Sequence, residues 1–154
     1  MNKPMETATD YQKWVTINTG KQEVFDALTR GIDHWWGKVD QPAVEPGDIF
    51  KISFGEGSYW KFNIVDLVVP QTVTWECVES HQDHHIAGID KEWLGSKLYW
   101  EIYENENGTE VRLLHQGLVP SGVCYGVCAN AWDFYIADSL KNYLEKGEGK
   151  PGEM

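Results

Sequence analysis

The chain has 154 residues, of which 42% are hydrophobic and 24% charged, and this is enough to form one domain with its own core. Its formal net charge is -11, from 24 acidic and 13 basic residues, which argues against nucleic acid and anionic membrane surfaces as partners. No signal-like apolar segment and no stretch long enough to cross a membrane is visible. The three cysteines have no disulfide-framework spacing, so we expect a reduced, cytoplasmic protein.

The first third of the chain predicts a strand, a short helix and a turn rich in aromatic residues. Residues 1–10 are polar, and we expect them to be frayed, outside a single domain that covers 11–150. Apolar residues alternate with polar ones over 11–18, which predicts a strand. The spacing over 19–29 predicts a helix with one apolar side. The segment "DHWWG" at 33–37 then places two indoles side by side.

A series of alternating segments predicts an antiparallel sheet with one apolar face. Asn-Gly within 105–109 is a typical hairpin turn between the last two strands. The predicted strands are 49–55, 57–69, 71–79, 93–104 and 110–118.

After Pro120 the apolar spacing changes to about four residues, which predicts a long amphipathic helix over 124–147. The order of elements indicates an α+β fold, in which a curved antiparallel sheet wraps around one long C-terminal helix. A curved sheet and a straight helix do not meet along their whole length. We therefore expect a ligand pocket between them.

The sequence also resembles the activator of heat-shock-90 ATPase homologue 1-like family, within the START/polyketide-cyclase-like (SRPBCC) superfamily. The resemblance covers roughly residues 11–150 and rests on motifs that are mostly structural. These are "VFDALT", "WWG", "PGDIF", "VTWE", "EWLGSKLYWEI", "NGTEVRLLHQGL" and "SLKNYLEKG". It implies a helix-grip fold with a cavity between sheet and helix. It also implies functions that range from binding hydrophobic molecules to cyclase chemistry and co-chaperone activity, because a fold hosts many functions.

Large rings on the covered face of the sheet and on the helix are candidate ligand contacts. Each of them also fits a plain core, because burying an indole is strongly favourable by itself. His115 is the polar candidate, since the alternation of Val111, Leu113 and His115 aims it inward. The expected ligand-binding residues are Trp35, Trp36, Trp60, Phe62, Trp75, Trp100, His115 and Trp132.

Three functions remain open from the sequence. The first is binding of a small hydrophobic or amphipathic molecule in the cavity, with neither a cofactor nor a metal. The second is a co-chaperone-like module that acts on a heat-shock-90 chaperone. The third is a cyclase, dehydratase or hydrolase in which His115 is the acid or base, with Asp66 or a water as its partner. No catalytic residue is assigned, because no nucleophile–base–orienter set is evident.

Two further clusters have simpler interpretations. The segment 80–92 holds His81, Asp83, His84 and His85, but their spacing matches no zinc motif, and we expect a lid over the pocket. Cys124 and Cys128 are four residues apart on one face of the predicted helix. We expect them to pack closely against the sheet.

Overall fold

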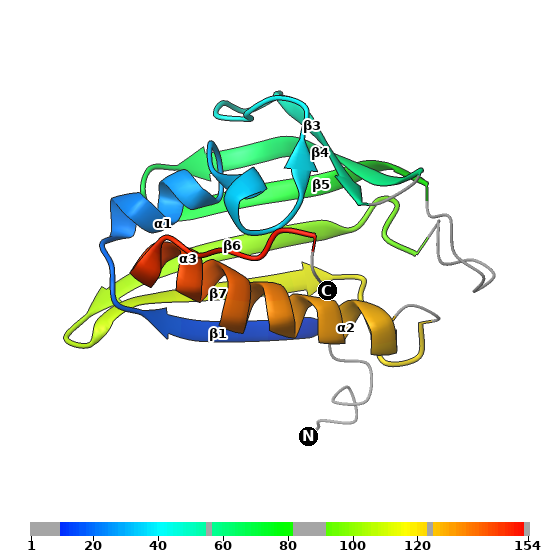
Figure 1. Cartoon of the computed structure of the whole chain (residues 1–154). Helices are drawn as coiled ribbons and strands as arrows, with labels where there is room; N and C mark the ends of the chain where they lie inside the picture. Colours follow the sequence, from blue (N-terminus) through cyan, green and yellow to red (C-terminus); the bar gives the residue numbers. More distant parts are fainter. Residues whose placement is uncertain (1–9, 55–56, 82–91, 123–124, 153–154) are drawn as a thin grey trace, which may run out of the picture.

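Figure 1 shows the computed structural model of the chain, which describes residues 10–54, 57–81, 92–122 and 125–152. The seven strands found in these residues form one antiparallel sheet in the order β1-β7-β6-β5-β4-β3-β2. The strands are β1 (Tyr11–Ile17), β2 (Lys38–Val39), β3 (Ile49–Phe54), β4 (Ser58–Val68), β5 (Thr72–His81), β6 (Lys97–Asn105) and β7 (Gly108–Gln116). Neighbours in sequence are neighbours in the sheet except at β1, which pairs with β7.

The alternating patterns place one face of the sheet inside the molecule, as predicted. On β6 the buried residues are Leu98, Trp100 and Ile102, and the residues between them are more exposed. The cross-strand register then joins these positions into buried rows. Trp100, for example, pairs with Val73 of β5 and Leu113 of β7, and both partners are also buried.

One expectation about β4 was wrong. The alternation from Trp60 through Ile64 placed Asp66 on the covered face, but Asp66 is exposed. The register between β4 and β5 shifts between Ile64 and Asp66, which indicates a bulge. An extra residue in one strand turns every following side chain to the other face. Leu67 therefore points inward, opposite buried Val73, and Asp66 points to solvent.

The C-terminal helix runs through three segments, α2 (Tyr125–Phe134), the π-helical η4 (Tyr135–Leu140) and α3 (Lys141–Lys146). Cys128, Trp132, Ile136 and Leu140 are buried, each four residues after the last. In a regular α-helix of about 3.6 residues per turn, a spacing of four drifts around the axis. The wider turn of η4 corrects this drift, so that the stripe keeps facing the sheet.

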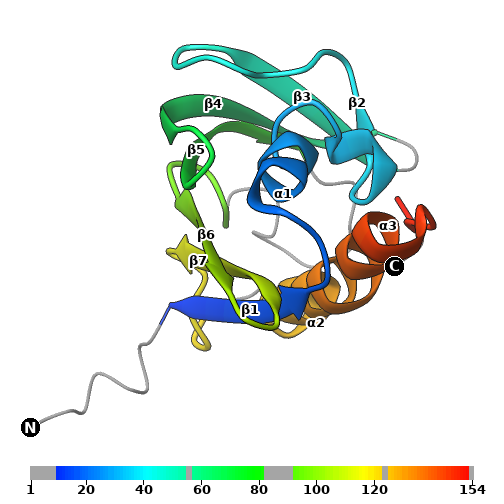
Figure 2. The ribbon, with the colours of Figure 1, turned by 90° about the vertical axis from the view of Figure 1, so that its left-hand side faces the viewer.

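Figure 2 looks roughly along the strands, so that the curvature of the sheet is visible, with β1 at the bottom and β2 and β3 at the top. The C-terminal helix lies on the open side of this half-barrel, and α1 (Lys21–Ala27) lies inside it at one end. The helix docks on β1 through polar contacts as well. The Tyr11 hydroxyl donates to Asp133 (2.6 Å) and the Lys141 ammonium donates to the Thr16 carbonyl (2.8 Å). The predicted α+β helix-grip fold is therefore confirmed.

The sequence missed the two short elements that flank the paired indoles. These are the 3₁₀ turn η2 (Ile32–His34) and the edge strand β2. It also started β6 four residues too early, since residues 92–96 form bends and a turn. Within the described residues, no helix is both long and apolar enough to span a bilayer.

Candidate ligand site between the sheet and the C-terminal helix

The structure brings all eight predicted site residues together between the sheet and the helix. Trp36 comes from the turn after η2, and Trp132 comes from α2. Seven of the eight are buried, and Trp60 is partly buried and packed against them. The remaining members of the set are Trp35 beside Trp36, Trp60 and Phe62 on β4, Trp75 on β5, Trp100 on β6 and His115 on β7.

The Trp36 ring lies at the centre of this group and is only 2% exposed. Its centroid is 4.8 Å from that of Trp132 on the helix and 5.7 Å from that of Trp75 on the sheet. The Trp36 and Trp75 planes are nearly parallel, at 7°. Its ring also contacts those of Trp35, Phe54, Trp60, Phe62 and Trp93. A side chain of the protein itself therefore occupies the middle of the interior.

Trp93 belongs to the site, and the sequence analysis missed it. It is 3% exposed, stacks on Trp60 at 4.1 Å and 14°, and meets His115 edge-on at 4.5 Å. A strand starting at residue 93 puts odd and even positions on opposite faces, and so separates Trp93 from Trp100. Residues 92–96 are instead bends and a turn, which resets this alternation before β6 begins. Aromatic character alone could have identified Trp93.

The indole N–H groups in the interior divide into two kinds. Trp35 Nε1 donates to the Ala27 carbonyl (2.7 Å), and Trp132 Nε1 donates to His115 Nδ1 (3.2 Å). Four other buried indole nitrogens have no acceptor among the described residues. They are those of Trp60, Trp75, Trp93 and Trp100.

An unpaired buried donor costs about 1–3 kcal/mol, because it has lost water and gained nothing. Edge-on contact with another ring, as between Trp75 and Trp100 at 60°, returns only a small part of this. Buried polar groups in folded proteins are nearly always hydrogen-bonded. Four such donors in one aromatic cluster therefore mark a place where a hydrogen-bond acceptor would be stabilised.

His115 is held in one tautomer by its two partners. The indole of Trp132 can only donate, so His115 Nδ1 must be the acceptor and carry no proton. In the neutral ring, Nε2 then carries the proton and donates it to Ser96 Oγ (2.9 Å). Burial disfavours the imidazolium and lowers the pKa of His115 to about 3. Near neutral pH the ring is uncharged, with both nitrogens in use.

This arrangement does not favour His115 as a catalytic acid or base. A base that activates Ser96 needs a free lone pair on Nε2, but Nε2 carries the proton here. The partner proposed for catalysis, Asp66, points to solvent. The interior geometry is that of a satisfied buried histidine that links Ser96 on one side to Trp132 on the other.

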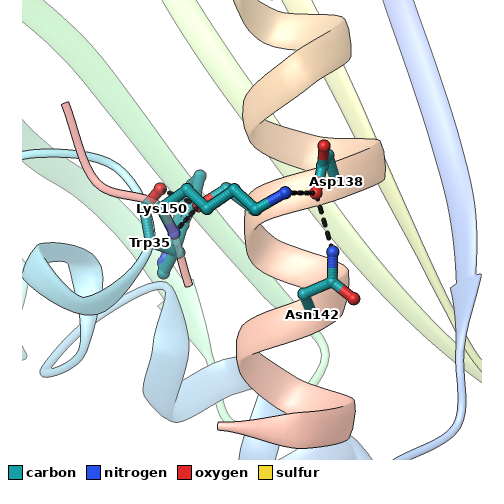
Figure 3. A network of polar contacts seen from close by, with 5 residues as sticks. Trp35, Asp138, Asn142 and Lys150 are labelled. Carbon is teal, nitrogen blue, oxygen red and sulfur yellow. Dashed lines mark hydrogen bonds and ion pairs between the residues drawn. The ribbon is translucent and has the colours of Figure 1, made fainter. Parts of the chain in front are cut away.

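The backbone of the paired indoles is fastened to the C-terminal helix and to the segment after it (Figure 3). Buried Ser139 donates from Oγ to the Trp35 carbonyl (2.6 Å) and accepts from the Lys150 backbone N–H (2.7 Å). The Gly152 N–H donates to the Trp36 carbonyl (2.8 Å). The Lys150 ammonium reaches Asp138 (2.9 Å), which also accepts from Asn142. The backbone of Trp35 and Trp36 is thus held by residues near the end of the chain.

The other predicted clusters have mixed outcomes. In the segment 80–92, His81 ends β5, and its ring centroid lies 5.9 Å from that of Tyr59. Asp83, His84 and His85 lie outside the described residues.

The expectation of reduced cysteines was wrong, because Cys128 is disulfide-bonded. Cys128 is buried, as expected, while Cys124 lies outside the described residues. Cys77 is a free buried thiol, and burial raises its pKa to about 12.

Hollows on the outer surface are lined by other residues than the predicted ones. One hollow of about 400 Å³ lies between α1 and α3, where His34 stacks on Tyr143 at 5.1 Å. Another, of about 410 Å³, lies on the outer face of the sheet and includes Trp14 and Arg112. A third, of about 580 Å³, includes Gln71 and Tyr103. None of these three involves the interior indoles.

Comparison with solved structures places this fold among known ones. A solution structure described as the Aha1 dimer from Colwellia psychrerythraea matches with a TM-score of 0.73 and 24% identity, over 92% of this chain and 99% of that one. Protein MLL2253 from Mesorhizobium loti matches at 0.71 and 20%, over 87% and 95%. Protein SSP2350 from Staphylococcus saprophyticus matches at 0.69 and 18%, over 93% and 97%. At these identities the likeness establishes the fold alone.

A search of curated proteins found no match to this chain. Comparison with protein families gives one over most of its length, from residue 18 to residue 145. This region runs from the end of β1 to the last turn of α3, and so contains every residue of the aromatic interior. The chain belongs to the family described as activator of Hsp90 ATPase homolog 1-like protein.

Proposed function

We propose that the protein binds a small, flat, mostly apolar molecule in its interior, at the position that the Trp36 ring occupies. The observation that carries this proposal is the set of four buried indole N–H groups that find no acceptor within the described part of the chain. Three of them belong to Trp60, Trp75 and Trp93, whose rings all contact Trp36. An indole has no acceptor atom, so Trp36 cannot satisfy these donors. A ligand of similar shape that carries an acceptor can do so.

The energetic argument concerns a replacement of one ring by another. Trp36 stacks between Trp75 of the sheet and Trp132 of the helix. A flat ligand in its place recovers most of the ring contacts, and each new hydrogen bond adds about 1 kcal/mol. Trp36 belongs to a short turn between η2 and β2, and rotation of its side chain would vacate the site while the backbone hydrogen bonds of Trp35 and Trp36 stay in place.

The indole N–H signals in a ¹H–¹⁵N NMR spectrum provide a direct test, with 9-fluorenone as the probe. Saturable one-to-one binding should shift the signals of Trp60, Trp75 and Trp93, and leave exposed Trp14 unchanged. Replacing Trp36 by leucine should tighten binding by about tenfold, because the competing ring is gone. The variant Trp14→Leu is the matched control on the outer face. Absence of binding by both the wild type and Trp36→Leu would refute the proposal.

A second candidate is docking on a heat-shock-90 chaperone, which an exposed aromatic patch favours. Trp14 is 60% exposed and Tyr103 is 45% exposed, and Arg112 lies over the Tyr103 ring at 4.9 Å. Exposed aromatic residues beside arginine are frequent in protein interfaces. The chain's charge of -11 suits a basic partner surface. Stimulation of a purified chaperone ATPase, weakened by Trp14→Ala, would support this function. No stimulation would exclude it.

A further inference from the structure

The unpaired polar groups around the ring cluster are mostly hydrogen-bond donors. Tryptophan contributes a donor and no acceptor, and four such donors are unpaired. The acceptor that His115 contributes, Nδ1, already receives the Trp132 N–H. Ser96 stands at the margin, and its oxygen already accepts from His115. Ser80 Oγ, across from Trp60 in the sheet, is also buried and unpaired among the described residues, and a hydroxyl can donate as well as accept. A molecule entering this cluster therefore meets mainly hydrogen-bond donors that need partners.

The interior also holds no compensating charge among the described residues. The buried polar or charged side chains are Thr29, Thr109, His115 and Ser139. The two threonines and Ser139 donate to backbone carbonyls, and His115 is uncharged near neutral pH. An ionised ligand would lose its hydration and find no counter-ion, which is strongly unfavourable.

From these two properties we infer that the interior selects neutral, aromatic molecules that carry a carbonyl-type acceptor. Aromatic ketones and non-reactive quinone-like compounds are the chemical class. This inference rests on the proposed function and specifies its ligand. A hydrocarbon leaves the four donors unpaired. A carboxylate buries a charge.

Ligands that share one ring skeleton separate the effect of the acceptor from the effect of a charge. The probes are 9-fluorenone, fluorene and fluorene-9-carboxylate, with Kd measured by calorimetry and by quenching of tryptophan fluorescence. We expect the ketone to bind about tenfold more tightly than the hydrocarbon, since one unpaired buried group corresponds to that factor or more. The carboxylate should bind at least 100-fold more weakly than the ketone.

Conservative variants identify the donors. Trp60→Phe, Trp75→Phe, Trp93→Phe and Trp100→Phe each remove one N–H and keep an aromatic ring. In at least one of them the ketone-to-hydrocarbon ratio should fall toward one, while the Kd for fluorene changes less than threefold. Trp14→Phe should leave both affinities unchanged. Because each variant still binds fluorene in this design, loss of folding is distinguished from loss of selectivity.

The outcomes separate the inference from the function beneath it. Equal affinity for fluorenone and fluorene, or a selectivity that all four phenylalanine variants retain, overturns the inference and leaves interior binding standing. Tighter binding of the carboxylate than of the ketone overturns it as well. Failure of every probe to bind overturns the proposed function itself.

Discussion

The two faces of the sheet present the same residue type under opposite conditions. On the outer face, Trp14 is 60% exposed, and its N–H can meet water. On the inner face, Trp75 and Trp100 are fully buried, and their N–H groups meet no acceptor among the described residues. The outer indole therefore needs no hydrogen-bond acceptor from the protein. Each inner one contributes a large apolar surface and leaves a polar edge unpaired.

This difference shows that the interior contains residues that are locally unfavourable for stability. Filling the interior with leucine or phenylalanine would bury similar apolar area without any orphaned donor. The outer face has no such tension, because its polar groups pair with each other or with solvent. Lys61, for example, lies 3.6 Å from Glu79. Locally unfavourable choices tend to concentrate at functional sites, and here they concentrate inside.

The largest expected effect contrasts the central ring with the exposed one. Trp36→Ala should lower the free energy of unfolding by about 3–5 kcal/mol, because it removes a ring packed between sheet and helix. Trp14→Ala should change it by no more than about 0.5 kcal/mol. Urea denaturation of both variants measures this. Similar losses at the two positions would mean that the outer indole is also part of the folded core.

A pH effect of intermediate size should come from His115. Its pKa is about 3 in the folded protein, against 6.5 for an unperturbed histidine. Below pH 6.5 the unfolded chain takes up a proton that the folded protein refuses, so this contribution to stability is complete above pH 6.5. It falls by about 1.4 kcal/mol per pH unit toward pH 3.

The variant His115→Asn isolates that contribution. Asparagine can accept from Trp132 but does not titrate in this range, so the variant should lose stability less steeply as pH falls from 6.5 to 4. Denaturant unfolding at several pH values provides the measurement. Parallel pH profiles for the wild type and the variant would show that His115 titrates normally in the folded state.

A smaller contrast separates paired from unpaired indoles. Trp132→Phe and Trp100→Phe remove the same atoms, but only the first removes a hydrogen bond, the one to His115 Nδ1. We expect Trp132→Phe to cost about 1–2 kcal/mol more than Trp100→Phe, because it leaves His115 with an unpaired acceptor. The ¹⁵N shifts of the imidazole should then report a mixture of tautomers. Equal stability costs and an unchanged tautomer would mean that the Trp132 contact does not hold the ring.

Simple patterns in the sequence were sufficient for most of the architecture. Period-two alternation identified β6 and β7 with their inward residues, and the change of spacing after Pro120 identified the C-terminal helix. The family resemblance pointed to the same fold. These features are local, because a strand or helix reveals its buried face within a few residues of itself.

Tertiary structure decided what that interior contains. The bulge after Ile64 turned Asp66 to solvent, and the turn at 92–96 brought Trp93 inside, and neither interruption breaks the apolar pattern visibly. The tautomer of His115 depends on Trp132, seventeen residues away on another element. Whether an indole N–H finds a partner depends on which backbone and side chains surround it in space. Composition supplied the indoles of this protein, but only the packing of sheet against helix determined which of them were left without an acceptor.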